Sequence, residues 1–139
     1  MRELPRQLSA EELTPLFSGR TRLVDELAAR EDPLGVAEEV ALALPEADQV
    51  AALATHPRIG EPSEEQRGAE PGVLAELELL NDEYERRFGF SFVVFVNGRT
   101  RAELVPVLRA RLARTREEEL AAGLRALCEI ARNRWTRTT

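Results

Sequence analysis

The segment from Thr55 to Gln66 brings together side chains that could exchange protons with a substrate. It reads Thr-His-Pro-Arg-Ile-Gly-Glu-Pro-Ser-Glu-Glu-Gln and contains His56, the only histidine of the chain. Histidine is the side chain whose ordinary pKa, about 6.5, lets it both accept and donate a proton near neutrality. A carboxylate within a turn or two of it, such as Glu65, makes an acid–base pair geometrically feasible. The residues alone leave a second interpretation open, in which His56 is fixed against Pro57 as an ordinary turn residue.

The same segment contains a helix start. Ser63 and Gln66 have the spacing of a capping box, in which the serine hydroxyl and the glutamine side chain each bond to a backbone N–H of the first turn. This role explains both residues without any ligand. A helix N-terminus also presents unpaired N–H groups and a partial positive charge, so the turn between His56 and Gln66 could instead hold an anion.

The composition excludes several classes of chemistry. All 19 basic residues are arginine, so the chain has no lysine for a Schiff base, a pyridoxal phosphate anchor or a phosphate-binding loop. One histidine and one cysteine, Cys128, argue against a zinc site and against an internal disulfide. Cys128 lies on a helical pattern, which favours a small core residue over a nucleophile. We therefore expect no metal and no organic cofactor.

Charge and hydropathy limit the classes of binding partner and the cellular location to expect. The net charge is −6, with acids and arginines interspersed, which argues against a nucleic-acid-binding surface. No apolar run reaches the roughly 18 residues of a membrane span, and none near the N-terminus has signal-peptide length. We expect one domain over residues 1–139, located in the cytoplasm, with a small anionic molecule as partner and with neither nucleic acid nor membrane.

Apolar residues at spacings of three and four predict a chain built almost entirely of helices. Three further capping boxes mark helix starts, at Ser9–Glu12, Thr100–Glu103 and Thr115–Glu118. Helices are expected over 10–17, 21–32, 33–45, 46–54, a short stretch after 63, 73–88, 100–112 and 115–135. Pro57 should end the fourth of these ahead of residue 56, and Pro106 should kink its helix or delay its start.

The segment Phe90–Val96 has the composition of a β-strand, and Asn97-Gly98 is a hairpin-type turn signal. It has no second run to pair with, and a lone strand leaves its backbone groups without partners. We expect that it is not part of a sheet. It is then either an extended core segment bonded to side chains, loops or a ligand, or the entry to a helix. Arg99, just beyond it, is either a solvated loop charge or a clamp for a carboxylate.

The set and order of these motifs resemble the family of 2-oxo-4-hydroxy-4-carboxy-5-ureidoimidazoline (OHCU) decarboxylases. The matching motifs are His-Pro at 56–57, Glu-Gln at 65–66, Leu-Asn-x-x-Tyr at 80–84, Phe-Gly-Phe-x-Phe-Val-Val at 88–94 and Gly-Arg-Thr at 98–100. The resemblance implies an all-α fold, a single-domain multi-helix bundle with one extended buried segment at about 90–96. It also implies a homodimer that needs no cofactor and converts OHCU to (S)-allantoin and carbon dioxide in urate degradation.

Site residues follow from the same resemblance. His56 matches the catalytic histidine of the family, and Glu65 matches its catalytic glutamate. The expected substrate-binding residues are Pro57, Ser63, Gln66, Phe92, Val93, Val94, Phe95, Val96 and Arg99. Two alternatives remain at this stage. One is a non-catalytic helical interaction or dimerisation module, and the other is the same fold acting on a related ureido heterocycle.

Overall fold

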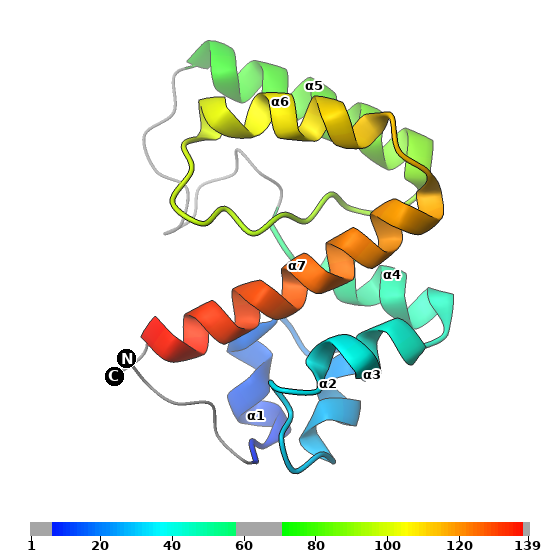
Figure 1. Cartoon of the computed structure of the whole chain (residues 1–139), viewed down its shortest axis with the longest axis vertical. Coiled ribbons are helices and arrows are strands. Elements are labelled where there is room, and N and C mark those ends of the chain that lie inside the picture. The colour runs from blue at the N-terminus through cyan, green and yellow to red at the C-terminus, as the bar shows by residue number, and fades with distance from the viewer. Residues whose placement is uncertain (1–6, 58–70, 138–139) are drawn as a thin grey trace.

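The computed structural model describes residues 7–57 and 71–137, and within these ranges every regular element is a helix (Figure 1). The elements are α1 (Ala10–Leu13), the short 3₁₀ helix η1 (Thr14–Leu16), α2 (Arg22–Ala28), α3 (Ala37–Ala43), α4 (Glu46–Ala54), α5 (Pro71–Phe88), α6 (Arg101–Leu112) and α7 (Arg116–Arg137). The predicted all-α fold is confirmed. The short helix expected after residue 63 lies outside the described residues.

Helix α7 connects the two halves of the described structure. In Figure 1 it crosses the molecule diagonally, with the α5–α6 pair above it and α1 to α4 below it. It packs against η1, α3 and α4. Its inner stripe, which includes Leu124, Leu127 and Ala131, is fully buried, and so is Cys128, as expected for a small core residue. The longest helix is therefore the element on which the lower helices assemble.

The helix starts follow the capping chemistry of the sequence. In α1, Ser9 Oγ accepts from the Glu12 N–H at 3.1 Å, and Glu12 Oε1 accepts from the Ser9 N–H at 3.0 Å. The same reciprocal pairs form at the starts of α6 and α7. These bonds satisfy N–H groups that have no partner inside the helix. The three predicted capping boxes in the described residues are confirmed.

Several helix boundaries differ from expectation: the first helix gives way to the 3₁₀ helix η1 at Thr14, and the second ends at Ala28 rather than at residue 32. The third helix begins at Ala37 rather than near Pro33, because the Asp32 carboxylate accepts from the Gly35 N–H at 3.3 Å and closes a turn there. The helix that contains Pro106 starts directly at Arg101, which excludes the later start and leaves the kink as the expected effect of Pro106. Proline has no N–H, so the carbonyl of Ala102 has no partner at Pro106 inside the helix. Both residues are exposed, so water can hydrate this carbonyl.

The segment from Phe90 to Val96 is extended and pairs with no strand among the described residues, as expected. Arginine side chains bind its carbonyls instead of a neighbouring strand. Val93 O accepts from Arg111 Nη1 at 3.1 Å, while Phe95 O and Val96 O accept from Arg99 Nη2 and Nε at 2.7 and 3.1 Å. The extended conformation is therefore held from its flanks by guanidinium groups.

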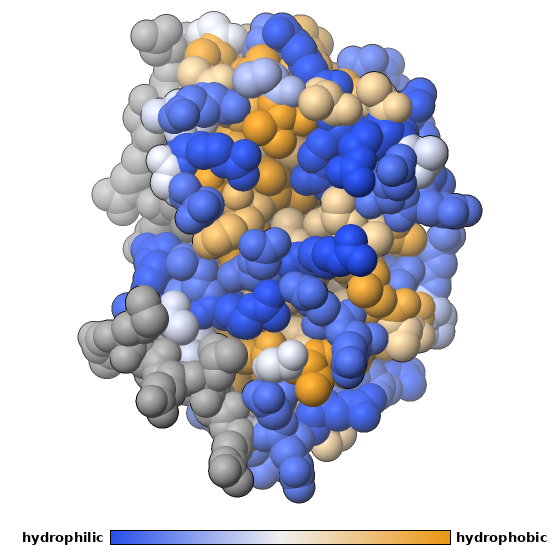
Figure 2. Space-filling view, in the orientation of Figure 1, coloured by the Kyte–Doolittle hydropathy of each residue, from blue (hydrophilic) through white to orange (hydrophobic). Residues whose placement is uncertain are grey.

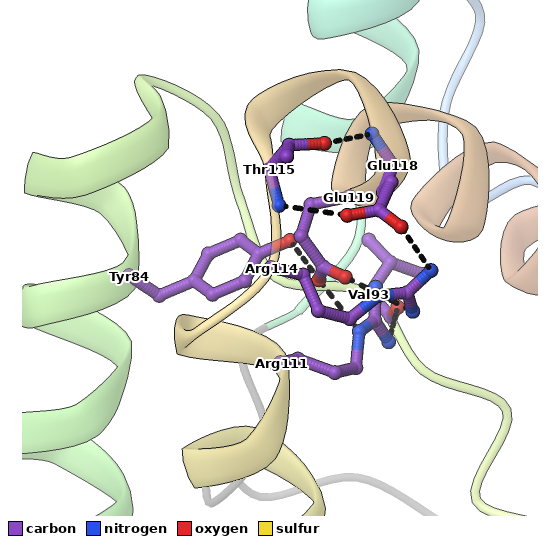
Figure 3. Close-up of polar contacts among 7 residues, drawn as sticks. All are labelled: Tyr84, Val93, Arg111, Arg114, Thr115, Glu118 and Glu119. Carbon is purple, nitrogen blue, oxygen red and sulfur yellow. Dashed lines mark hydrogen bonds and ion pairs between the residues drawn. The ribbon is translucent and has the colours of Figure 1, made fainter.

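A buried carboxylate anchors this segment to the helices (Figure 3). Glu119 of α7 is fully buried; its Oε1 accepts from Tyr84 Oη of α5 at 2.8 Å and from Arg111 Nε of α6 at 2.6 Å. Arg114 Nη1 lies 3.2 Å from the other carboxylate oxygen. Arg111 also lies over the ring of Phe92, 4.5 Å from its centroid. Burial, together with the bond to Glu119, raises the pKa of Tyr84 above its ordinary value, so the phenol stays a donor.

Removing a member of this network should destabilise the protein according to the charge left unpaired. We expect Tyr84→Phe to lower the free energy of unfolding by about 1 kcal/mol, since it removes one neutral donor. Glu119→Ala leaves the Arg111 guanidinium buried without its carboxylate and should cost about 3–5 kcal/mol. Urea denaturation measures both, with Glu117→Ala, an exposed position in the same helical turn, as the control. Equal losses for Glu117→Ala and Glu119→Ala would contradict the anchoring role.

Candidate active site

His56 lies just beyond the C-terminal end of α4. The helix ends at Ala54, Thr55 is its C-cap, and the His56 N–H donates to Leu53 O at 3.2 Å. Pro57 follows, and proline disfavours helical backbone in the residue before it. The predicted end of this helix is confirmed, and it leaves His56 and Pro57 half-buried at the surface of the bundle.

The turn formed by Phe17, Ser18 and Gly19 packs against this helix end. Thr55 Oγ1 donates to Phe17 O at 3.0 Å, and the His56 ring atom Nδ1 lies 3.4 Å from Ser18 Oγ. A Cβ at Gly19 would lie 3.0 Å from Thr55 Cγ2, so a side chain at position 19 would crowd the Thr55 side chain. These contacts fix the position of His56 relative to the first helices.

Arg134, in the last turns of α7, holds the same turn from the other side. Its Nη1 donates to Ser18 Oγ at 2.7 Å and to the carbonyls of Leu16 and Pro15 at 3.2 and 3.3 Å. The carbonyls at the end of η1 thereby gain a cationic donor, which suits the partial negative charge of a helix C-terminus. Three elements therefore meet at His56: η1 with its turn, α4 and α7.

The extended segment forms a second group of predicted site residues. Phe92 and Val93 are buried, whereas Val94, Phe95 and Val96 are half-buried and pack at the edge of the core. Figure 2 shows apolar surface in the upper half of the molecule, over the region of α6 and the extended segment, bordered by hydrophilic side chains. The apolar side chains of Val94, Phe95 and Val96 are therefore partly accessible at this surface.

Arg99 binds its own loop rather than solvent alone. The two bonds to Phe95 O and Val96 O use two of the five N–H donors of its guanidinium, which is half-buried. Asn97 and Gly98 form the turn between them with φ values of +49° and +77°. The guanidinium therefore shapes the loop and keeps part of its surface exposed to solvent. Its role as a carboxylate clamp stays a prediction.

The structure thus places the predicted residues in two described groups. His56 and Pro57 lie with the lower helices, and Phe92 to Val96 with Arg99 lie beside α5 and α6. Glu65, Ser63 and Gln66 lie outside the described residues, so their expected positions remain predictions. Among the described residues, no cluster of three or more His, Cys, Asp or Glu side chains could hold a metal ion. In the same ranges, no helix has the length and apolar character to cross a membrane.

Ser18 and Arg134 were not identified as site residues from the sequence. Ser18 precedes a glycine and has the local pattern of a loop, and Arg134 has that of a favourable charge near a helix C-terminus. They are 116 positions apart in the chain, and Ser18 is 38 positions from His56. No local spacing rule links residues at such separations, so only the packing of α7 against η1 brings them to His56.

The arrangement of helices first defines a class of protein. It matches a crystal structure of OHCU decarboxylase in the presence of (S)-allantoin, with a TM-score of 0.75 and 23% identity over 84% of this chain and 89% of that chain. It also matches a crystal structure of (S)-allantoin synthase, with a TM-score of 0.72 and 17% identity over 92% of this chain and 48% of that chain. At these identities the likeness shows a shared all-α fold.

Sequence comparison then identifies the family. The family model described as OHCU decarboxylase matches residues 3–136. The uric acid degradation bifunctional protein PucL of Bacillus subtilis (strain 168) is 35% identical over 98 residues, which cover 62% of this chain and 20% of PucL. This chain belongs to the OHCU decarboxylase family, as the order of motifs predicted. It spans about a fifth of the length of the curated relative that it matches.

The close contact between Gly19 and Thr55 predicts an energetic coupling. We expect Gly19→Ala to lower the free energy of unfolding by about 1 kcal/mol or more, because Thr55 is held by its hydroxyl bonds and cannot easily move away. The Thr55→Ser background keeps the hydroxyl and removes the methyl. In this background, Gly19→Ala should lower the free energy of unfolding by at least about 0.5 kcal/mol less than in wild type. Urea denaturation of the four proteins tests this. An identical cost in both backgrounds would mean that the contact does not fix the turn.

Proposed function

We propose that this chain decarboxylates OHCU to (S)-allantoin and carbon dioxide without a cofactor. The observation that carries the proposal is the family match over residues 3–136, which includes the only histidine of the chain. That histidine is half-buried at a helix end and has a hydroxyl group beside its ring. Partial burial with a polar partner is a suitable environment for a group that transfers protons.

The chemistry requires proton transfer rather than an electron-accepting cofactor. Decarboxylation leaves the electron pair of the broken C–C bond, and the OHCU ring has an unsaturated C–N bond next to the carbon that carries the carboxylate. As carbon dioxide leaves, that pair forms a C=C bond and the ring nitrogen gains a proton. Loss of the hydroxyl proton and delivery of a proton to the ureido-bearing carbon then give (S)-allantoin. We assign the hydroxyl proton to His56, poised by Glu65, a contribution typically worth 10²–10⁴ in rate.

The extended segment is assigned to substrate binding. Because Phe92 and Val93 are buried, we assign the closer contacts to the half-buried Val94, Phe95 and Val96, with the other two supporting them from the core. The carbonyls of residues 95 and 96 already accept from a guanidinium, so the N–H groups of this stretch are the natural donors to a ligand.

The remaining polar contacts are assigned by residue type. Arg99 offers its further N–H groups to the carboxylate of the substrate. Ser63 and Gln66, at a predicted helix start, would supply backbone and side-chain donors to the anionic and ureido parts. Pro57 would fix the direction in which the chain leaves His56.

We further propose a homodimer in the cytoplasm. Leu79 on α5 keeps 69% of its surface exposed, and a large exposed apolar side chain suits a subunit contact. Cys128 is a free thiol whose pKa burial raises to about 12, which suits a reducing compartment in which thiols stay unpaired. Sedimentation equilibrium tests the dimer, and a single species at the chain mass of 15.6 kDa would contradict it.

The direct test of activity mixes the purified protein with freshly generated urate-oxidation products. After exhaustive chelation and desalting of the protein, we expect circular dichroism to show rapid formation of optically active allantoin. Racemic allantoin forming at the rate of the protein-free control would contradict the proposed reaction. Turnover of a different ureido heterocycle, with none of OHCU, would assign the fold to another substrate.

Variants test the proposed acid–base pair. We expect His56→Asn and Glu65→Gln each to reduce the decarboxylation rate by about 10²-fold or more, the loss typical of removing general acid–base catalysis. Thermal unfolding of each variant should stay close to that of wild type; His56 is half-buried and is not part of the buried core. A stable His56→Asn protein with full activity would rule out the assigned role.

A further inference from the structure

Ser18 has a backbone conformation that its residue type disfavours. Its φ is +63°, and among the described residues only Asn97 shares a positive φ without being glycine. Such a conformation costs on the order of 1 kcal/mol or more in a residue with a Cβ, and it persists only where the surroundings determine it. Here, Thr55 binds the carbonyl of the preceding residue, and Gly19 packs against the Thr55 methyl. A glycine would relieve the strain at position 18, so the serine side chain requires its own explanation.

The hydroxyl of Ser18 bridges a cation and the histidine. Arg134 Nη1 donates to Ser18 Oγ at 2.7 Å, and a guanidinium nitrogen can only donate. The hydroxyl hydrogen therefore points away from Arg134, and the oxygen keeps a second lone pair. Both can face His56 Nδ1, which lies 3.4 Å from Oγ. Hydrogen bonds of catalytic groups are often long without substrate and shorten when it binds.

We propose that Ser18 is a positioning residue for His56, held in place by Arg134, and that it reserves the ring atom Nε2 for proton exchange with the substrate. This inference rests on the proposed acid–base role of His56. The hydroxyl donates to Nδ1 when that nitrogen is unprotonated and accepts from Nδ1–H when it is protonated, by rotating its hydrogen. Arg134 meanwhile keeps Oγ in place. The ring therefore holds one orientation while its protonation state changes.

Two substitutions at Ser18 distinguish a role in positioning His56 from a purely structural role. Ser18→Gly removes the hydroxyl and relieves the positive φ, whereas Ser18→Ala removes the hydroxyl and keeps the strain. A structural role would leave Ser18→Gly fully active and at least as stable as wild type. A positioning role predicts that both variants lose about 10-fold or more in kcat, with KM changed by less than about twofold, since orientation of a catalytic group acts on the chemical step.

Arg134 has a matched control on the same helix. Arg134→Gln removes the charge that holds Ser18 Oγ, whereas Arg137→Gln removes a charge one helical turn further on, whose Nη1 lies 3.4 Å from Asn133 Oδ1. We expect Arg134→Gln to lower kcat in the same direction as Ser18→Ala and Arg137→Gln to leave it unchanged. Equal effects of the two arginine variants would contradict the role of Arg134.

A spectroscopic test is independent of activity. Because the chain has one histidine, the ¹⁵N signals of its ring belong to His56 without further assignment. We expect the Nδ1 resonance to shift in Ser18→Ala and Ser18→Gly by more than the Nε2 resonance does. Unchanged ring signals, or full kcat in Ser18→Gly, would overturn the inference even if wild type is an active decarboxylase. An inactive wild type would instead overturn the proposed function, while the Nδ1 shift would still test the contact with Ser18.

Discussion

The carboxylate of Glu119 imposes the main physical constraint on this structure. It is fully buried, and a buried charge is tolerated only where donors surround it. The donors come from Tyr84 on α5 and Arg111 on α6, so the carboxylate fixes three long helices relative to one another. Arg111 also binds the carbonyl of Val93, which gives a strand-like segment the partner that a sheet would otherwise supply. The extended segment of the candidate site therefore depends on one buried carboxyl group and the donors around it.

Helix α7 carries this constraint to the second group of site residues. Glu119 lies near its start and Arg134 near its end, about 22 Å apart at 1.5 Å per residue. At one end the helix orders the extended segment, and at the other it holds the turn of Ser18 beside His56. A single helix thus contacts both groups of predicted site residues, one through Glu119 and the other through Arg134.

The sequence predicted the features that depend on local chemistry. The capping boxes of α1, α6 and α7 and the stop before Pro57 follow from neighbouring residues, and these were found. The lack of a second strand-like run in the sequence correctly predicted that Phe90–Val96 pairs with no strand among the described residues. The contacts that hold the site do not follow from neighbouring residues. Glu119 closes a run of three consecutive acids in the first turn of α7, and nothing local shows that it alone is buried. Ser18 and Arg134 reach the histidine only through tertiary packing. Glu65, with Ser63 and Gln66, remains a prediction from the family resemblance.

If His56 and the extended segment line one ligand site, a titration with (S)-allantoin should perturb both. In ¹⁵N-labelled protein, the ring of the only histidine and the backbone amides of Val94, Phe95 and Val96 can be followed together. We expect all of these signals to shift along one binding curve with a single dissociation constant. Shifts confined to the histidine, or to the extended segment, or separate binding curves for the two, would contradict it.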